Sequence, residues 1–449
     1  MPVRKICYDL QLLTMPTPSL LIVPARFKSG KLYSQIPTSG AGDFTVTRAT
    51  SATRVNASGL IESVASGIPR LDYLASGGTV GCPALLVEPS GSNLAFNSQT
   101  WASGNNWGLS NVTIATATSE TTAPDGTSTA NALSPTSGNV VHVTVSNSST
   151  QIAYTSGTIY TQSAFFKQGT GVAGRYVQLT FNATAFTQAG YANFDLQDGV
   201  AFTPSGTTAD ANRASRIENY GNGWYRCRFS ATCNASGNAN GLNAVFITAS
   251  GDVRRPSFSG TVTDVLYGWG AQLETGSFAT SYIPTTTAAV TRNADVVAVS
   301  GTASGSIGQT EGTIYAEVDI KNFTNGTRIL AISDGTQANR IAILFNTTNR
   351  IRLLATVTSA TQADINTATN QPAGIYKIAV AYATNDYVLY VNGVQIGTDT
   401  TALVPACSSI FLGTLETGSG LSSLNDRIRA AALYNTRLTN DQLAALTSP

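Results

Sequence analysis

Few residues of this chain could carry out acid–base or metal chemistry, and the single histidine, His142, is the first candidate. It lies in the segment VVHVTV, where strand alternation places it on the face opposite Val141 and Val143. We therefore predict a solvent-facing strand residue rather than a catalytic base. No GxSxG sequence accompanies His142, so a serine-hydrolase triad is not indicated. One histidine and scattered cysteines also do not provide the three or four protein ligands of a zinc site.

Two pairs of closely spaced carboxylates could in principle hydrolyse a glycosidic bond, which needs two facing acids at set separations. Glu317 and Asp319 lie on one face of an expected strand, and Asp195 and Asp198 flank an expected turn. A solvated outer face explains both pairs more simply than an active site does. We therefore predict that the chain is not an enzyme and has no catalytic residues, no cofactor and no metal site. An acid pair formed between subunits is the alternative.

The four tryptophans are the remaining candidates for a binding site, because sugars stack the apolar faces of their rings on aromatic side chains. Trp224 and Trp269 lie in alternating strands and are expected in the core. Trp101 and Trp107 lie in the segment WASGNNWG, flanked by glycine and asparagine near the entry to an expected domain. We predict Trp101 and Trp107 as ligand-binding residues, with packing across the N-terminal leader as the structural alternative.

The overall composition excludes two classes of partner. Charged residues make up only 11% of the chain, against roughly 25% in an average globular protein. The net charge is +1 and lysine and arginine form no run, so a nucleic-acid partner is not expected. No stretch approaches the 18 or more apolar residues of a membrane span.

The cysteines and the start of the chain bear on the cellular compartment. The first apolar piece is interrupted by Asp9 and by prolines, so we do not expect a signal peptide. The five cysteines are an odd number without CxxC spacing, and we expect reduced, structural thiols, which fits assembly in a cytosol. They are Cys7, Cys82, Cys227, Cys233 and Cys407.

Period-2 alternation predicts the elements that must position any site. In residues 224–231, Cys227 and Phe229 share one face while Arg226 and Arg228 share the other. Glycine-rich turns separate many short runs of this kind, and no helical period lasts three turns between residues 93 and 284. Such a pattern is typical of a β-sandwich or jelly roll. Similar runs occupy residues 140–145, 160–166, 176–181, 244–249 and 265–273.

The last third of the chain carries the sharpest local signals. Asn392-Gly393, in YVLYVNGVQI, supplies the two positive-φ residues of a type I′ hairpin turn. Near the end, Thr439 is placed to cap a short helix, and Gln442 completes a capping box. We therefore expect an all-β protein with one short C-terminal helix.

Composition shifts divide the chain into four parts. Residues 1–92 are expected to be an irregular N-terminal leader with a small β docking segment, whose first 39 residues could be deleted without unfolding the rest. Residues 93–300 are expected to form a carbohydrate-binding-like β-sandwich. The glycine-rich residues 301–312 read as a linker, and residues 313–449 as a second sandwich. The arrangement predicted is thus two tandem jelly rolls behind a leader.

Several segments resemble a module found in tail-fibre and other structural proteins of bacteriophages. A strand ending in GAQLE is followed by SYIPTT and VTR within residues 265–297, and CPALLVEPSGSNLAFNS at residues 82–98 resembles the preamble of that module. The tripeptide VTR occurs at residues 46–48 and again at residues 290–292, a faint internal similarity. The resemblance implies a virion component assembled in the cytoplasm of a bacterial host. It also implies contacts with other virion proteins and a homo-oligomer, most often a trimer.

A second resemblance covers about a third of the chain. The strand from residue 313, the VNG hairpin and the ending LYNTRLTNDQLAAL are similar to the laminin-G or concanavalin-A-like jelly-roll family. Domains of this family often bind calcium, but Asp334 and Asp386 are too few loop acids for its six to eight oxygen ligands.

Together these patterns predict a phage virion structural protein, a fibre or appendage subunit. Its N-terminus would dock to the particle, and its sandwiches would bind host-surface glycan or another virion protein. The alternatives are a polysaccharide depolymerase with an intersubunit acid pair and a purely structural decoration or adaptor protein.

Overall fold

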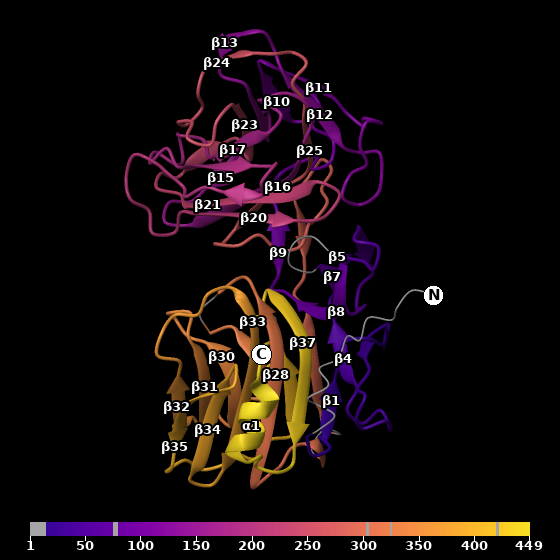
Figure 1. The fold of residues 1–449 in the computed structure, drawn as a ribbon, viewed down its shortest axis with the longest axis vertical. Helices are drawn as coiled ribbons and strands as arrows, with labels where there is room; N and C mark the ends of the chain where they lie inside the picture. The colour runs from indigo at the N-terminus through magenta and orange to yellow at the C-terminus, as the bar shows by residue number, and fades with distance from the viewer. Residues whose placement is uncertain (1–14, 75–79, 302–304, 324–325, 419–421) are drawn as a thin grey trace.

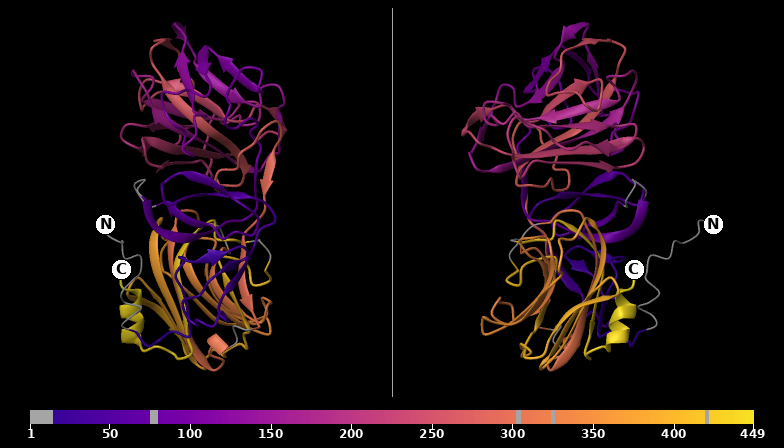
Figure 2. Two further views of the ribbon diagram at one scale, coloured as in Figure 1. Left: turned by 90° about the vertical axis from the view of Figure 1, so that its right-hand side faces the viewer. Right: turned by 60° about the vertical axis from the view of Figure 1, so that its left-hand side comes forward.

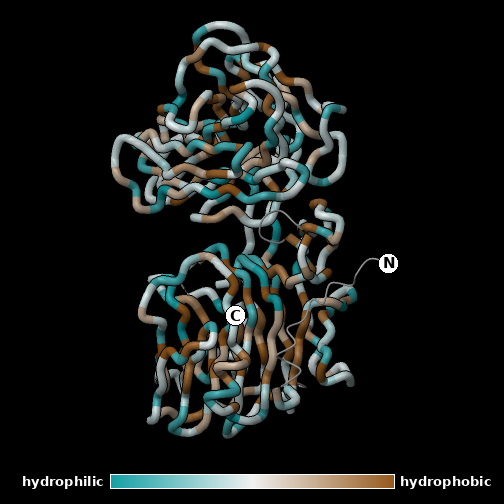
Figure 3. The backbone as a smooth tube through the Cα atoms, in the orientation of Figure 1, coloured by the Kyte–Doolittle hydropathy of each residue, from teal (hydrophilic) through white to brown (hydrophobic). Residues whose placement is uncertain are grey.

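Two β-sandwiches stacked along the long axis make up the protein (Figure 1). The computed structural model describes residues 15–74, 80–301, 305–323, 326–418 and 422–449. Within these residues the chain is built from strands and one short C-terminal helix, so the predicted all-β class is confirmed. Figure 3 shows hydrophobic stretches running along the strands, where the two main cores lie.

The first sandwich, in the upper half of Figure 1, consists of two six-stranded sheets packed face to face. One sheet has the order β10 (Trp107–Ser110), β14 (Val143–Ser146), β23 (Asn243–Ile247), β17 (Tyr176–Thr180), β18 (Tyr191–Asp195), β19 (Val200–Ala201). The other has the order β11 (Val112–Ala115), β12 (Asn131–Pro135), β25 (Leu266–Thr275), β16 (Ile159–Gln168), β21 (Trp224–Thr232), β20 (Ala214–Asn219). Two small ribbons pair β13 (Gly138–Val140) with β24 (Phe258–Gly260) and β15 (Ile152–Tyr154) with β22 (Gly237–Ala239).

The second sandwich combines strands from both ends of the chain. Its eight-stranded sheet has the order β35 (Val394–Asp399), β34 (Asp386–Val391), β33 (Gly374–Ala383), β28 (Glu311–Ile320), β37 (Asp426–Tyr434), β8 (Val80–Val87), β7 (Leu71–Leu74), with β1 (Leu20–Ile22) also on β37. Its nine-stranded sheet has the order β2 (Phe27–Lys28), β3 (Lys31–Leu32), β4 (Phe44–Thr47), β27 (Val296–Ser300), β36 (Ser409–Leu412), β29 (Arg328–Ser333), β30 (Arg340–Phe345), β31 (Ile351–Val357), β32 (Ala360–Asn366).

The order of the strands shows that the first sandwich is inserted into the second rather than placed before it in tandem. The chain leaves the second sandwich after β8 and returns to it at β27. The two connections pair with each other as a two-stranded ribbon, the stalk, which consists of β9 (Gly91–Asn93) and β26 (Val290–Arg292). A separate hairpin of β5 (Ala52–Val55) and β6 (Ile61–Val64) lies beside the stalk.

This topology places the predicted domain boundaries differently. The described part of residues 1–92 is not a free docking segment, because β1 pairs with β37 and β4 pairs with β27. The predicted linker at residues 301–312 lies between β27 and β28, both of which belong to the second sandwich. Ile307 within it is buried in the main core of that sandwich.

Local sequence explains several details of the strands. Strand β25 does not keep the regular alternation expected for it, because the pairing with β16 shifts register between Ser163 and Phe165. The extra residue lies on β25, and Gly270 within this bulge has a φ of +64°, which favours glycine. Leu266 before the bulge and Leu273 after it therefore both face the core, although they differ by an odd number of positions.

The C-terminal signals were predicted correctly. Asn392 and Gly393 both have positive φ, as a type I′ turn requires. Thr439 caps α1 (Asn440–Thr447), and the Gln442 side chain accepts a hydrogen bond from the Thr439 backbone N–H, which completes the capping box. Helix α1 buries Leu443 and covers the outer face of the eight-stranded sheet, as Figure 2 shows beside the C-terminus.

Candidate functional site

A buried network of five charged side chains lies at the base of the stalk. We call this set the junction network; its members are Arg48, Arg70, Glu88, Arg292 and Asp295. Arg70 Nη1 lies 2.5 Å from Glu88 Oε2, and Arg70 Nη2 donates to Asp295 Oδ2. Arg48 Nη1 donates to Asp295 Oδ1 at 2.8 Å, and Arg292 Nη2 lies 3.5 Å from Glu88 Oε2. The network therefore joins the end of β4, the end of β8 and the connection that leads from the first sandwich back to β27.

Electrostatics keep the network ionised although it is buried. Burial alone would raise the pKa of Glu88, but the charges of Arg70 and Arg292 and the hydrogen bond from Ser281 outweigh burial and lower that pKa. Burial alone would lower the pKa of Arg70, but Asp295 and Glu88 raise it. Buried charges persist only when they are paired and hydrogen-bonded in this way.

The first sandwich is fastened to this network through the loop that follows β25. Ser281 N donates to Glu88 Oε1 at 2.6 Å, and Ser281 Oγ donates to Glu88 Oε2 at 2.7 Å. At the end of β25, the buried Glu274 accepts hydrogen bonds from the Thr280 N–H at 2.8 Å and from Thr280 Oγ1 at 2.7 Å. The loop therefore has a fixed path between the last strand of the first sandwich and the second sandwich.

The segments that resemble the phage module converge here. Glu88 comes from VEPS, Glu274 from GAQLE and Ser281 from SYIPTT. The two VTR segments supply Arg48 and Arg292, so the internal similarity places two arginines in one network. The sequence analysis did not identify these residues as a site. The signal that could have identified them is that a charged residue repeatedly follows the end of an apolar strand.

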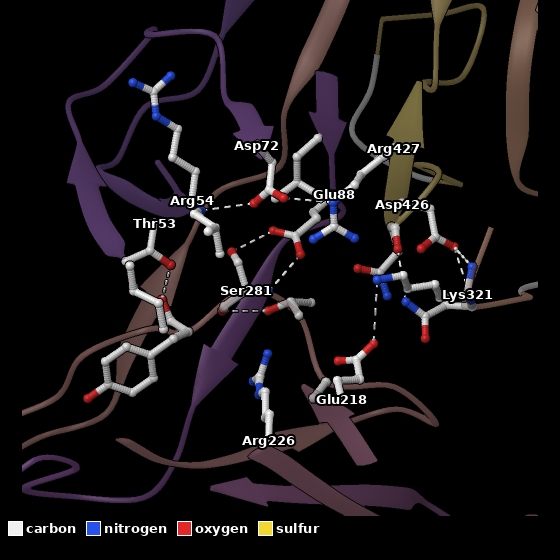
Figure 4. Close-up of a pocket in the computed structure, with 18 of the residues that line it drawn as sticks. Thr53, Arg54, Asp72, Glu88, Glu218, Arg226, Ser281, Lys321, Asp426 and Arg427 are labelled. Carbon is white, nitrogen blue, oxygen red and sulfur yellow. Dashed lines mark hydrogen bonds and ion pairs between the residues drawn. The ribbon is translucent and has the colours of Figure 1, made fainter. Parts of the chain in front are cut away.

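A small cavity, the junction cavity, lies beside the network (Figure 4). Its volume is about 50 Å³, enough for roughly three to five water molecules. Its walls come from the hairpin β5–β6, from β20, β21 and the loop after β25 in the first sandwich, and from the second sandwich. The charged residues of the wall are Arg54, Asp72, Glu88, Glu218, Arg226, Arg228, Lys321, Asp426 and Arg427.

Polar contacts between the two sandwiches surround this cavity. Arg216 Nη1 donates to the Lys321 carbonyl at 2.7 Å, and Arg228 Nη1 donates to Asn322 Oδ1 at 2.8 Å. Lys321 Nζ lies 4.0 Å from Glu218 Oε1. The relative orientation of the sandwiches is thus held by the stalk, the junction network and these few hydrogen bonds. An apolar cluster that contains Leu74 of β7 together with Phe165 and Trp269 of the first sandwich also contributes.

Two carboxyl groups of the cavity have opposite pKa shifts. Burial raises the pKa of Asp426 to about 8, although the N–H groups of Asn322 and Lys321 donate to it. Burial would raise the pKa of Glu218 too, but Lys321 and Arg216 lower it to about 2. Asp426 therefore disfavours the folded state as pH rises from its ordinary value of 3.8 towards 8, and Glu218 stabilises it at pH values above its ordinary 4.5. At pH 7 Asp426 is mainly protonated and Glu218 is charged.

A larger cavity, the side groove, lies between β5 and the stalk. It has a volume of about 290 Å³, at the low end of the range for ligand pockets. Ser51, Ser63 and Thr291 place hydroxyl groups on its exposed part, and Val290 is a partly exposed apolar residue there. Its lining contains no carboxylate, and its one charged residue, Arg292, is buried in the junction network. The groove therefore offers neutral hydroxyl groups and some apolar surface, and its lining provides no acid pair.

The two tryptophans predicted to bind ligand are in the core of the first sandwich. Trp101 is 0% exposed and Trp107 is 2% exposed, and their rings stack with centroids 4.6 Å apart. Their Nε1–H groups donate to the carbonyl oxygens of Ser98 and Asn97. Neither ring offers a free face to a sugar. Packing, the structural alternative, therefore describes their environment. The residues around them belong to the first sandwich and not to the leader.

We expect Trp101→Ala to lower the free energy of unfolding of the first sandwich by about 3–5 kcal/mol, the usual cost of truncating a buried aromatic side chain. Thermal or urea unfolding of the purified protein measures this. Adhesion to host cells, normalised to the folded fraction, should be unchanged. Weaker adhesion with unaltered stability would instead show that the ring reaches a ligand.

The other candidate residues serve the structure. The expectation of a solvent-facing His142 is wrong: its side chain is buried, with Nδ1 2.7 Å from the Asn111 carbonyl oxygen and Nε2 3.2 Å from that of Phe258. The strand β24 covers the sheet face that alternation alone had assigned to solvent. Glu317 pairs with Arg429 at 2.6 Å, and Asp195 pairs with Arg175.

The next features are possible metal ligands, membrane-spanning helices and cysteines among the described residues. No group of three or more histidine, cysteine, aspartate or glutamate side chains there could hold a metal ion. No helix in the described part of the chain is long and apolar enough to cross a membrane. Cys227, Cys233 and Cys407 are free and buried, but Cys82 is disulfide-bonded, so the expectation of reduced thiols is wrong for Cys82.

Comparison with protein families identifies the C-terminal part. Residues 291–444 match a laminin-G-type model described as the concanavalin A-like lectin/glucanases superfamily. The second sandwich therefore contains a concanavalin A-like jelly-roll domain, as the sequence resemblance implied. No curated protein matches the chain at a significant level.

Among solved structures, the matches are distant. The CBM40 module of an IT-sialidase from Ruminococcus gnavus is 20% identical, with 31% of this chain and 84% of that chain covered and a TM-score of 0.27. Domain 4 of an extracellular arabinanase from Geobacillus stearothermophilus is 17% identical, with coverages of 34% and 73% and a TM-score of 0.29. Trypanosoma rangeli sialidase is 10% identical, with coverages of 71% and 60% and a TM-score of 0.28. Likenesses at this level assign neither ligand nor activity to this chain.

Proposed function

We propose that this chain is a structural subunit of a bacteriophage particle, a fibre or appendage protein, that binds host-surface glycan without cleaving it. The observation that carries the proposal is the convergence of the phage-module-like segments on the junction network. These segments build the junction between the two β-sandwiches. Such a junction suits a protein that holds a binding domain away from a particle. The same resemblance suggests a homo-oligomer, most often a trimer, and contacts with other virion proteins.

The glycan part of the proposal has two supports. The superfamily matched by residues 291–444 is described by its lectins and glucanases. The side groove presents neutral hydroxyl groups and apolar surface on its exposed part, a combination that can hydrogen-bond and pack against a sugar. We assign the side groove as the glycan-contacting site.

Binding without turnover is the favoured activity. Glycoside hydrolysis needs two carboxyl groups facing one substrate, and the lining of the side groove contributes none. Of the four acids considered in the sequence analysis, Glu317 is engaged by Arg429, and Asp195 and Asp198 are engaged by Arg175. A depolymerase would need an acid pair completed by another subunit.

Two measurements test the proposal. An antibody to this protein should label intact phage particles by electron microscopy. Purified native protein should adhere to host cells and release no reducing sugar from their surface polymers. Release of defined fragments would establish the depolymerase instead, and labelling without adhesion would leave a purely structural subunit.

The side groove can be tested by blocking it. We expect Ser63→Trp to fill the groove from β6 and to reduce adhesion at least tenfold, with little change in stability because Ser63 is exposed. Ser259→Trp, on an exposed position of β24 in the first sandwich, is the matched control. Equal adhesion of the two variants would exclude the groove as the glycan site.

A further inference from the structure

A buried guanidinium without an ion-pair partner projects into the junction cavity. Arg226, on β21, is only 4% exposed, and Figure 4 shows it extending from the first sandwich towards Ser281 and Glu88. Its Nη2 donates to Ser163 Oγ at 3.1 Å, but its Nε is buried and has no hydrogen-bond partner. No carboxylate of the described residues lies within ion-pair distance of it. A buried charge in this state costs several kcal/mol unless something compensates it.

The carboxylates around the cavity already have other partners. Glu88 pairs with Arg70, and Asp72 Oδ1 lies 2.7 Å from Arg427 Nε. Glu218 Oε1 lies 3.3 Å from Arg216 Nε and 4.0 Å from Lys321 Nζ. None of these three acids forms an ion pair with Arg226, although its charge is among those that lower the pKa of Glu218. The Arg226 guanidinium also lies over the Phe165 ring, 5.4 Å from the ring centroid.

Asp426 is the fourth acid of the cavity wall, and it too is occupied. Its Oδ2 accepts hydrogen bonds from the N–H groups of Lys321 and Asn322 at 2.9 and 2.8 Å. Burial favours its protonated form at neutral pH, because it raises the pKa of Asp426 to about 8. It therefore adds little negative charge to the cavity.

The cavity wall consequently has a surplus of positive charge. Arg54 lines the cavity but pairs with Glu62 at 2.7 Å. Four basic residues then remain against four acidic ones, and protonation of Asp426 leaves the positive charges in excess. The surplus also acts on Arg228: burial, together with repulsion by Arg216 and Arg226, lowers the pKa of Arg228 to about 10 despite the attraction of Glu218. The whole chain has a net charge of only +1, so this excess is local.

The size and position of the cavity limit what can neutralise it. At about 50 Å³ it is too small for a sugar or a nucleotide, but it has room for one small ion and a few water molecules. Its donors come from both sandwiches, with Arg226 and Arg228 from the first and Lys321 from the second.

We propose that the junction cavity is a binding site for a small monovalent inorganic anion of the halide class, held chiefly by Arg226. The bound anion compensates the guanidinium and bridges the two sandwiches. It thereby stabilises their contact and fixes the orientation in which the first sandwich is presented. The site is separate from the side groove and does not depend on glycan binding.

Full-length protein in sodium gluconate, titrated with sodium chloride at constant ionic strength, tests this site. Gluconate is too large for the cavity, so chloride should raise the melting temperature saturably, by roughly 2–4 °C. Crystals soaked in sodium bromide should show an anomalous peak beside Arg226. Identical melting curves in the two salts, or a cavity with water and no bromide peak, would overturn the proposal.

Variants assign the effect to this residue. Arg226→Gln should abolish the chloride-dependent shift. Arg254→Gln is the matched control, because Arg254 is a partly buried arginine of the same sandwich that donates to Thr180 Oγ1 and the Phe181 carbonyl. The control should keep the full shift. A shift that persists in Arg226→Gln would show that the anion binds elsewhere, and the bromide peak in the unaltered protein decides the question if that variant fails to fold.

Discussion

Replacing Arg70 by methionine should lower the free energy of unfolding by about 3–5 kcal/mol, the usual cost of breaking a buried ion pair from one side. Arg70 is the one residue that contacts both acids of the junction network, Glu88 and Asp295. It also donates to the Thr53 carbonyl at 3.2 Å and to Ser281 Oγ at 2.8 Å. Methionine fills most of the space but leaves two buried carboxylates short of positive charge. Urea unfolding measures the loss of free energy. Limited proteolysis at each urea concentration shows which of the two sandwiches has unfolded.

An exposed ion pair provides the control. Arg352 and Asp364 pair on the second sandwich, with side chains 28% and 39% exposed. Arg352→Met should cost about 0–1 kcal/mol, as surface pairs do. Adding Glu88→Gln to Arg70→Met should restore part of the lost stability, because it removes one uncompensated charge. If Arg70→Met costs no more than Arg352→Met, the network does not hold the junction.

The faces of individual strands could be predicted from the sequence because alternation records which side chains are buried. Cys227 and Phe229 lie in the first core, opposite Arg226 and Arg228, as the pattern of β21 indicated. Turn and cap chemistry was equally local, so the Asn392-Gly393 turn and the capping box on α1 were predicted correctly.

Alternation does not say what covers the second face of a strand. Arg226 and Arg228 share the polar face of β21, and that face forms a wall of the junction cavity. His142 was misassigned for the same reason, since β24 folds over it. In β25 the alternation itself is broken, because the bulge at Gly270 exchanges the two faces along one strand.

The candidate site could not be derived from spacing, because its members are far apart in the chain. Arg48 and Asp295, for example, are separated by 247 positions. Their juxtaposition depends on the insertion of the first sandwich between β8 and β27, which no local pattern records. What the sequence did contain was the recurrence of module-like segments, and those segments supply Glu88, Ser281 and Arg292.

The insertion topology reverses one expectation from the sequence, namely that the first 39 residues can be removed without harm. We expect deletion of residues 1–39 to unfold the second sandwich. Leu20, Ile22 and Leu32 are each 0% exposed in its main core, and loss of one such side chain typically costs about 2–5 kcal/mol. Three together approach or exceed the whole stability of an ordinary domain, about 5–15 kcal/mol. Circular dichroism and limited proteolysis of the truncated chain should show a lost second sandwich.

Deletion of residues 1–6 alone is the matched control, since it removes none of the described strands and none of the cysteines. That variant should retain the melting temperature of the full chain, and its incorporation into particles then tests the docking role proposed for the N-terminus. Because β1 pairs with β37 and β4 with β27, failure of the longer deletion to incorporate would reflect unfolding and would say nothing about docking. Unchanged melting after deletion of residues 1–39 would instead show that the first three strands are dispensable, and that the second sandwich folds from β4 onward.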